Sequence, residues 1–249
     1  MRLVLKSIFV DGGLMDRRSR ILKILIIVTV LFGMTLAFLN AKEDGYSHPA
    51  ARLLYFTNQS NIWIAATAAG LLALDLSGAD KNGRAYRIMY GLKFIFTVAI
   101  SLTAFIFFVV LAPGAGEQYP AWTVSNILVH ALSPALAIAD FFLERDDVVF
   151  TRREYFASVI PPLYYLVFCI VCYSMKLDFG RGDPFPYFFL NFGSPAGIFG
   201  SSDEFPYIIG SFYWMIFILA LVLGIALLFF RLHPATRKAR KKRLASKNT

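Results

Sequence analysis

ILKILIIVTVLFGMTLAFL, residues 21–39, is one of six apolar stretches that decide the fold of this chain. An apolar run of about 20 residues is long enough to cross a bilayer as a helix. Long unbroken runs favour helices, because a membrane barrel shows short alternating segments instead. The sequence therefore predicts an all-α integral membrane bundle of six transmembrane helices. The spans that we assign are residues 21–39, 53–74, 88–111, 123–143, 156–174 and 207–230.

The composition agrees with this assignment. Of the 249 residues, 57% are hydrophobic and 16% are charged, whereas about 25% of residues are charged in a soluble domain. A net charge of +9 raises the question of nucleic-acid binding. However, eight of the 25 Lys and Arg residues lie in residues 231–249, and the others flank apolar runs. This distribution is typical of membrane topology, so we expect no nucleic-acid partner.

Basic residues are distributed unequally between the two sets of connecting segments. Twenty of the 25 lie at the N-terminus, in alternate loops and in the tail. The other set of segments holds only Lys42, Arg52, Lys176 and Arg181. Because basic loops stay in the cytoplasm, this asymmetry predicts that both termini are cytoplasmic. We expect a multi-pass protein of the cell's inner or plasma membrane.

This topology divides the chain into three regions. Residues 1–20 form a cytoplasmic N-terminal segment, residues 21–230 the six-helix transmembrane domain, and residues 231–249 a basic cytoplasmic tail. We interpret the tail as a flank that is attracted to anionic lipid, with binding of a partner as the alternative.

The longest connection, residues 176–206, lies between the fifth and sixth predicted spans on the extracytoplasmic side. Its Pro and Gly residues interrupt a regular helix, yet it is too apolar for a solvated linker. We expect it to fold back onto the outer membrane surface and to cap the bundle.

No pattern in the sequence points to a metal or a cofactor. Cys169 and Cys172 lie in an apolar run with no His or further Cys beside them, so we interpret them as packing residues. No zinc-protease, Walker or dinucleotide-binding motif occurs. We therefore expect neither a metal nor a cofactor.

Polar residues gather in the outer half of two predicted spans. Thr57, Asn58 and Asn61 open the second span, and Asn126 and His130 share a face of the fourth. At 1.5 Å per residue, the hydroxyl lies about 6 Å and the imidazole about 10 Å below the start of its span, so both lie in the same leaflet. A titratable group at that depth is a functional candidate. The alternative is that these groups only hold helices together.

A second polar group lies at the cytoplasmic ends of three spans. It comprises Asp75, Lys93 and Asp140. We interpret these residues as an ion-paired or snorkelling belt at the inner interface. A proton relay would need acidic residues deeper in the bilayer, and the sequence places none there.

Five short motifs resemble those of bacterial Pr6Pr-type six-span membrane proteins. They are YFTNQSN (residues 55–61), HALSP (130–134), ADFF (139–142), PPLYY (161–165) and DPFPY (183–187). The likeness extends from the second span through the outer loop. The wider group is similar to the androgen-induced intramembrane threonine hydrolases, which cleave fatty-acid esters of hydroxy fatty acids.

The resemblance implies that Thr57 is a nucleophile and that His130 is its general base. On this hypothesis the side-chain amides of Asn61 and Asn126 stabilise the oxyanion, or Asn58 orients the imidazole. The expected partners are membrane lipids and a lipid-like ester substrate. Two alternatives stay open at this point. One is a non-enzymatic protein that binds or transports a lipid or small ligand in the same polar pocket, and the other is an assembly or scaffold protein.

Overall fold

The computed structural model describes residues 17–114, 121–143 and 148–245, with side chains described as far as residue 239. Helices make up most of these residues, which form no strand beyond one isolated bridge between Ser201 and Ile209. Most of the predicted N-terminal segment, residues 1–20, lies outside the described residues. The elements are α2 (Arg17–Leu39), η1 (Pro49–Leu54), α3 (Phe56–Leu76), α4 (Arg84–Ile106), η2 (Phe107–Leu111), α5 (Val124–Ile127), η3 (Leu128–Leu132), α6 (Ser133–Leu143), α7 (Arg152–Ala157), α8 (Ile160–Ser174), η4 (Phe188–Leu190), α9 (Ser211–Leu232) and α10 (Pro234–Ala245).

Five helical stretches of the described residues are long and apolar enough to cross a membrane. They are Arg17–Leu39, Arg84–Leu111, Val124–Leu143, Arg152–Ser174 and Ser211–Leu232. Each corresponds to one predicted span, although most begin a few residues earlier than expected. The chain therefore has the apolar helices of a multi-pass membrane protein.

The second predicted span, residues 53–74, corresponds to α3, which is not among these five stretches. It begins at Phe56 rather than Leu53, because the short 3-10 helix η1 occupies Pro49–Leu54 and Tyr55 separates it from α3. The polar residues after Phe56 lower the mean hydropathy of α3, which is why length and composition alone do not class it as a span. It packs in the same bundle, between α2 and α4.

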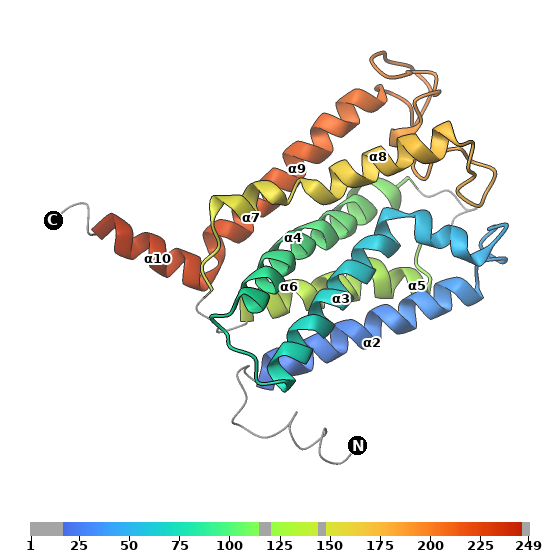
Figure 1. Ribbon diagram of the computed structural model, residues 1–249. Helices are drawn as coiled ribbons and strands as arrows, with labels where there is room; N and C mark the ends of the chain where they lie inside the picture. Colours follow the sequence, from blue (N-terminus) through green and yellow to red (C-terminus); the bar gives the residue numbers. More distant parts are fainter. Residues whose placement is uncertain (1–16, 115–120, 144–147, 246–249) are drawn as a thin grey trace.

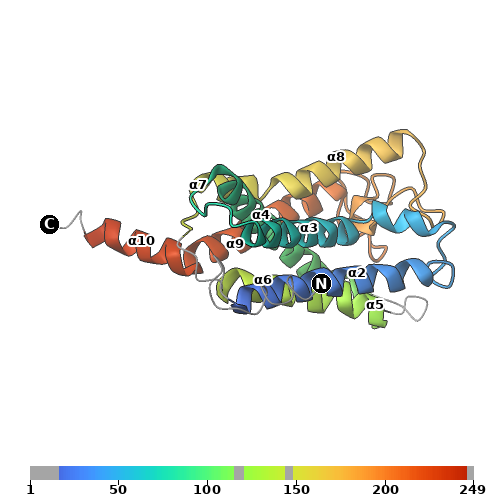
Figure 2. The same cartoon turned by 60° about the horizontal axis from the view of Figure 1, so that its bottom comes forward.

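The most buried long helix is α4, which lies at the centre of the bundle (Figures 1 and 2). It contacts α3, α6 and α9, and α2 packs against α3 and α6. Helix α9 meets the short α7, whereas its contacts with α8 are sparse. At its far end the chain continues from α9 into α10, which projects from the bundle (Figure 1).

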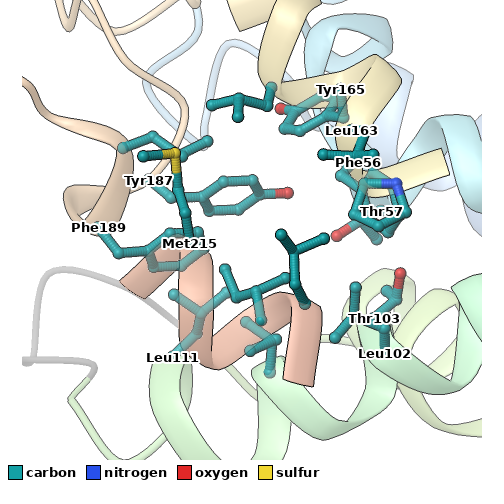
Figure 3. Close-up of a pocket in the computed structure, with 16 residues that line it drawn as sticks. Phe56, Thr57, Leu102, Thr103, Leu111, Leu163, Tyr165, Tyr187, Phe189 and Met215 are labelled. Carbon is teal, nitrogen blue, oxygen red and sulfur yellow. The ribbon is translucent and has the colours of Figure 1, made fainter. Parts of the chain in front are cut away.

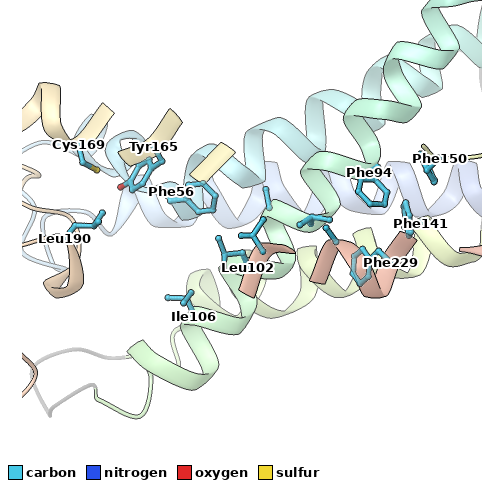
Figure 4. Packing of buried hydrophobic residues seen from close by; sticks show 14 of the residues in the cluster. Phe56, Phe94, Leu102, Ile106, Phe141, Phe150, Tyr165, Cys169, Leu190 and Phe229 are labelled. Atoms are coloured by element: carbon cyan, nitrogen blue, oxygen red, sulfur yellow. The ribbon is translucent and has the colours of Figure 1, made fainter. Parts of the chain in front are cut away.

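One large apolar cluster runs along the bundle and joins its two ends (Figure 4). It extends from Tyr165, Cys169 and Leu190 to Phe94 and Phe229. Both cysteines are buried and unbridged in this cluster, in accord with the packing role expected for them.

The connection between α8 and α9 packs apolar side chains onto the end of the bundle where α3 begins. Phe179, Phe189 and Leu190 are buried in the large cluster. The hydroxyl of Tyr55 donates to the carbonyl oxygen of Phe179 over 3.1 Å. This packing fixes the neighbouring Tyr187, whose ring stacks on Phe189 with a centroid distance of 5.0 Å.

At the opposite end of the bundle, five charged side chains are buried in two ion-paired groups. Lys93 and Lys23 both bind the carboxylate of Asp140, over 2.8 Å and 3.0 Å. Asp75 pairs with Arg20 over 2.7 Å. The ion-paired interpretation of Asp75, Lys93 and Asp140 is thus confirmed, but Asp75 belongs to a separate pair. The prediction missed two partners, Arg20 and Lys23.

Candidate functional site

The structure brings together the hydroxyl and the imidazole that the sequence singled out. Thr57 Oγ1 lies 3.2 Å from His130 Nε2, although 73 residues separate them along the chain. Both side chains are buried. Thr57 occupies the first turn of α3, and His130 occupies η3, which contacts α3. The distance is short enough for direct proton transfer between the two groups.

Two contacts fix the orientation of the His130 ring. Nδ1 lies 3.1 Å from the carbonyl oxygen of Asn126, and the ring stacks on Phe107 with a centroid distance of 4.0 Å. A carbonyl oxygen only accepts hydrogen bonds, so Nδ1 carries the hydrogen. In the neutral imidazole Nε2 is then an acceptor, and the hydroxyl of Thr57 must donate to it. The arrangement therefore presents a threonine oxygen to a base of the correct tautomer.

His130 and Phe107 lie in two π-helical turns, η3 and η2. Such turns are rare, and they often mark functional sites because they redirect side chains that a regular helix would place elsewhere. Here η2 ends the apolar stretch Arg84–Leu111, and η3 interrupts the stretch Val124–Leu143. No local sequence signal identifies them.

A close helix approach holds η3 in place. A Cβ atom at Gly33 of α2 would lie 2.9 Å from Val129 Cγ1 and 3.0 Å from Leu128 Cβ. Both neighbours belong to the π-helical turn that carries His130. Gly33 therefore allows α2 to support the backbone of this turn directly.

The amide of Asn61 is fully engaged in holding helices together. Its Nδ2 donates to the carbonyl oxygens of Thr57, over 2.8 Å, and Val129, over 3.0 Å. Its Oδ1 accepts from the hydroxyl of Ser133. Both amide hydrogens are used, so Asn61 does not fit the oxyanion-stabilising role that the sequence suggested. It joins α3 to η3 and α6 beside the Thr57–His130 pair.

The other two predicted amides lie beside the pair. The Nδ2 of Asn58 donates to the carbonyl oxygen of Arg52 over 2.6 Å. Because both ring nitrogens of His130 already have partners, Asn58 does not orient the ring as predicted. Asn126 orients it, through its backbone carbonyl rather than through the side-chain amide. Both residues line the same cavity as His130.

This cavity, the vestibule, has a volume of about 990 Å³. It lies under the connection between α8 and α9, and its polar lining includes two arginines, an aspartate, three tyrosines and the predicted site residues. The polar residues that line it are Tyr46, Arg52, Tyr55, Thr57, Asn58, Asn126, His130, Arg181, Asp183 and Tyr187. A space of this size and mixed lining can hold the polar part of a small ligand.

A second, narrow cavity of about 70 Å³, the apolar slot, begins at the other side of Thr57 (Figure 3). Its walls come from α4, α8 and α9, with Leu102, Leu163 and Met215 among them. It lies where the contacts between α8 and α9 are sparse. Thr57 and Tyr187 line both cavities, so the hydroxyl sits between a polar chamber and an apolar one.

Tyr187 is a residue of the site that sequence reasoning quoted only as part of a motif. Its hydroxyl points across the slot towards Thr57 (Figure 3), and it interacts with both the side chain and the backbone of that residue. Burial raises the pKa of the Tyr187 phenol, so the phenol keeps its proton and is a hydrogen-bond donor at neutral pH.

The described residues contain no cluster of three or more His, Cys, Asp or Glu side chains that is suited to hold a metal ion. Comparison with protein-family models, with curated proteins and with solved structures gives no match for this chain. The geometry of the site is therefore the basis for inferring a function.

Proposed function

We propose that this chain is a membrane hydrolase that cleaves ester bonds of lipids, with Thr57 as the nucleophile and His130 as the general base. The observation that carries the proposal is the 3.2 Å contact between their reactive atoms. The position of Thr57 between a polar and an apolar cavity supports a substrate with both characters. The motif resemblance to the intramembrane threonine hydrolases favours the same two roles.

The proposal includes six spans with both termini in the cytoplasm. Helix α3 counts as the second span because it is 21 residues long and packs between two apolar helices. Its polar residues Thr57, Ser60 and Asn61 are buried against other helices, so they avoid contact with lipid. With the basic segments inside, the site lies in the outer leaflet and the vestibule faces the extracytoplasmic side.

In the proposed reaction, Thr57 Oγ1 attacks the acyl carbonyl carbon while its proton passes to His130 Nε2. The ester C–O bond breaks, and the alcohol leaves with the proton that His130 returns. Water then attacks the acyl-threonine, again with His130 as base, and the acid and the free hydroxyl are released. Through its Nδ1 bond to Asn126, the ring keeps one orientation in both steps.

The cavities suggest how such a substrate is held. An acyl chain entering between α8 and α9 reaches the apolar slot directly from the bilayer. The polar part of the molecule then occupies the vestibule. The scissile carbonyl lies at Thr57, where the two spaces adjoin.

The test is hydrolysis of p-nitrophenyl decanoate, and of an ester between two fatty acids, by the purified protein in detergent. We expect Thr57→Ala and His130→Ala each to reduce kcat by about 10³-fold or more, because the two residues act as a unit. The Thr57→Ala change should cost only about 1 kcal/mol of stability, since it removes one hydrogen bond.

Thr67→Ala is the matched control. Thr67 lies on the same helix and is buried, but its hydroxyl only donates to the carbonyl oxygen of Trp63 over 2.8 Å. Thr67→Ala should cost a similar amount of stability and leave turnover unchanged. Turnover that survives Thr57→Ala, or that is equally lost in Thr67→Ala, contradicts the proposal.

The size of the vestibule favours a second candidate, a protein that binds or carries a lipid without cleaving it. On that account a fluorescent fatty-acid ester binds with saturable affinity and is recovered intact after long incubation. Its affinity falls when the vestibule is filled by Asn126→Trp, whereas it is unchanged in Thr57→Ser. Time-dependent release of free acid decides against this candidate.

A further inference from the structure

We infer that Tyr187 is a catalytic residue of the proposed hydrolase, and that its phenol hydroxyl donates the hydrogen bond that stabilises the oxyanion. The inference rests on the proposed function, which it extends with a group from the connection between α8 and α9. It assigns a chemical role to the DPFPY motif, residues 183–187.

The position of the hydroxyl supports this role. Figure 3 shows the Tyr187 ring opposite Thr57, with its oxygen directed at the threonine across the slot. The phenol interacts with both the hydroxyl and the backbone N–H of Thr57. That N–H belongs to the first turn of α3, where a helix has no internal acceptor for its amides. Two donors therefore converge beside the nucleophile, one from the phenol and one from the backbone.

The two predicted donors are less well placed for this role. Asn61 has both amide hydrogens bound to carbonyl oxygens. Asn126 lines the vestibule but not the apolar slot. Apart from Thr57 itself, Tyr187 is the polar residue that lines both the vestibule and the slot.

The donor and acceptor roles at Thr57 are compatible with this proposal. Thr57 donates to His130, which leaves the lone pairs of Oγ1 available to a donor such as the phenol. When Oγ1 attacks the carbonyl carbon, the C=O π bond breaks and its electron pair moves to the carbonyl oxygen. The phenol and the backbone N–H then donate to that oxyanion. The C=O bond re-forms as the C–O bond to the leaving alcohol breaks, so the phenol keeps its proton throughout.

The ring of Tyr187 is held firmly enough to aim the hydroxyl. It stacks on Phe189 and meets Tyr55 edge-on, with centroid distances of 5.0 Å and 5.9 Å. A phenylalanine at this position keeps these ring contacts and loses only the hydroxyl. The Tyr187→Phe variant therefore separates the chemistry of the residue from its packing.

The experiment compares wild type, Tyr187→Phe and Tyr165→Phe. Tyr165 is the matched control, because it lines the same slot but its hydroxyl donates to the carbonyl oxygen of Leu54 over 3.0 Å. Each protein is assayed with p-nitrophenyl decanoate and with the matching thionoester, in which sulfur replaces the carbonyl oxygen. Sulfur is a weak acceptor, so an oxyanion donor favours the oxygen ester.

We expect Tyr187→Phe to lower kcat for the oxygen ester by about 100-fold with little change in KM, as for loss of one oxyanion donor. The rate ratio of oxygen ester to thionoester should fall with it, by about tenfold or more, and stay unchanged in Tyr165→Phe. This ratio is independent of the amount of folded protein. Turnover that depends on Thr57 but is unaffected in Tyr187→Phe overturns the role of Tyr187 alone, whereas absence of any Thr57-dependent turnover overturns the hydrolase as well.

Discussion

The two ends of this bundle bury polar side chains in different ways. At the end where α6 terminates, three cations, Arg20, Lys23 and Lys93, meet the two carboxylates of Asp75 and Asp140. At the end where α3 begins, the groups proposed to react are a hydroxyl, an imidazole and a phenol. The charged side chains of the first end line neither the vestibule nor the apolar slot, whereas Thr57 and Tyr187 line both.

The difference teaches how to distinguish a structural polar cluster from a reactive one. Each carboxylate of the charged end is matched by a cation, so removing one partner leaves an uncompensated charge in an apolar environment. At the other end, Thr57 retains a cavity on each side, so a substrate can reach it. We therefore expect mutations at the charged end to act on stability, and mutations at the cavity end to act on turnover.

The largest loss of stability should follow Asp140→Ala. This change leaves Lys23 and Lys93 buried without their carboxylate, which typically costs about 3–5 kcal/mol. The measurement is thermal unfolding of the purified protein, with Asp203→Ala at an exposed position as control. Fluorophosphonate labelling of the remaining folded protein should be unchanged. If the Asp140→Ala variant is as stable as wild type, the ion pairs of this end do not stabilise the fold.

A substitution of one of the two lysines that bind Asp140 gives a sharper version of the same test. Lys93→Met removes one of these cations and keeps the pair between Lys23 and Asp140. We expect it to lower the unfolding temperature less than Asp140→Ala does. If the two variants unfold at the same temperature, pairing of charge does not explain the stability of this end.

A smaller loss should follow Gly33→Val. Its side chain would overlap Val129 and Leu128, so η3 must move, at a cost of about 1–3 kcal/mol for overpacking. Because η3 carries His130, turnover should fall more than stability predicts. Gly224→Val is the control, since a Cβ there meets no atom within 4 Å. Equal effects of the two substitutions would contradict the role of the close approach.

The stacking of Phe107 on His130 should contribute less still. Phe107→Leu should cost about 0.5–1.5 kcal/mol beyond lost apolar area. It should reduce turnover about tenfold, because the imidazole is less well oriented. Phe156→Leu, at an exposed position, serves as control for both measurements. Unchanged turnover in Phe107→Leu would show that the bond to Asn126 alone orients the ring.

The smallest effect on stability should follow a substitution in the lining of the apolar slot. Ile218→Trp narrows it, so the preference for decanoate over hexanoate esters should shift about tenfold towards the shorter chain. The unfolding temperature should stay close to that of wild type. Competition between the two p-nitrophenyl esters measures the shift. A preference that does not change would place the acyl chain elsewhere.

Much of the fold could be predicted from hydropathy, because a span of about 20 apolar residues is a strong local signal. The pairing of Thr57 with His130 could be predicted as well, since depth in the membrane follows from position along a helix. Helix α3 is the exception, because polar residues lower its mean hydropathy. These residues contact other helices, and composition does not reveal such contacts.

The rest of the site depends on contacts that no local pattern encodes. The π-helical turns at Phe107 and His130 and the approach of Gly33 arise from packing between helices distant in sequence. Asn61 was assigned to the oxyanion from its residue type, whereas the structure uses its amide between helices. Tyr187 lies in the irregular connection between α8 and α9, where the sequence does not indicate which way a side chain points.

The most direct test of the central claim is the mass of the protein after reaction with a long-chain β-lactone. Attack by Thr57 Oγ1 opens the ring and leaves an acyl ester on that oxygen. We predict an added mass equal to one lactone, located by peptide mapping at Thr57 and absent from both Thr57→Ala and His130→Ala. Acylation at another residue, or adducts that persist in these two variants, would contradict the proposed hydrolase.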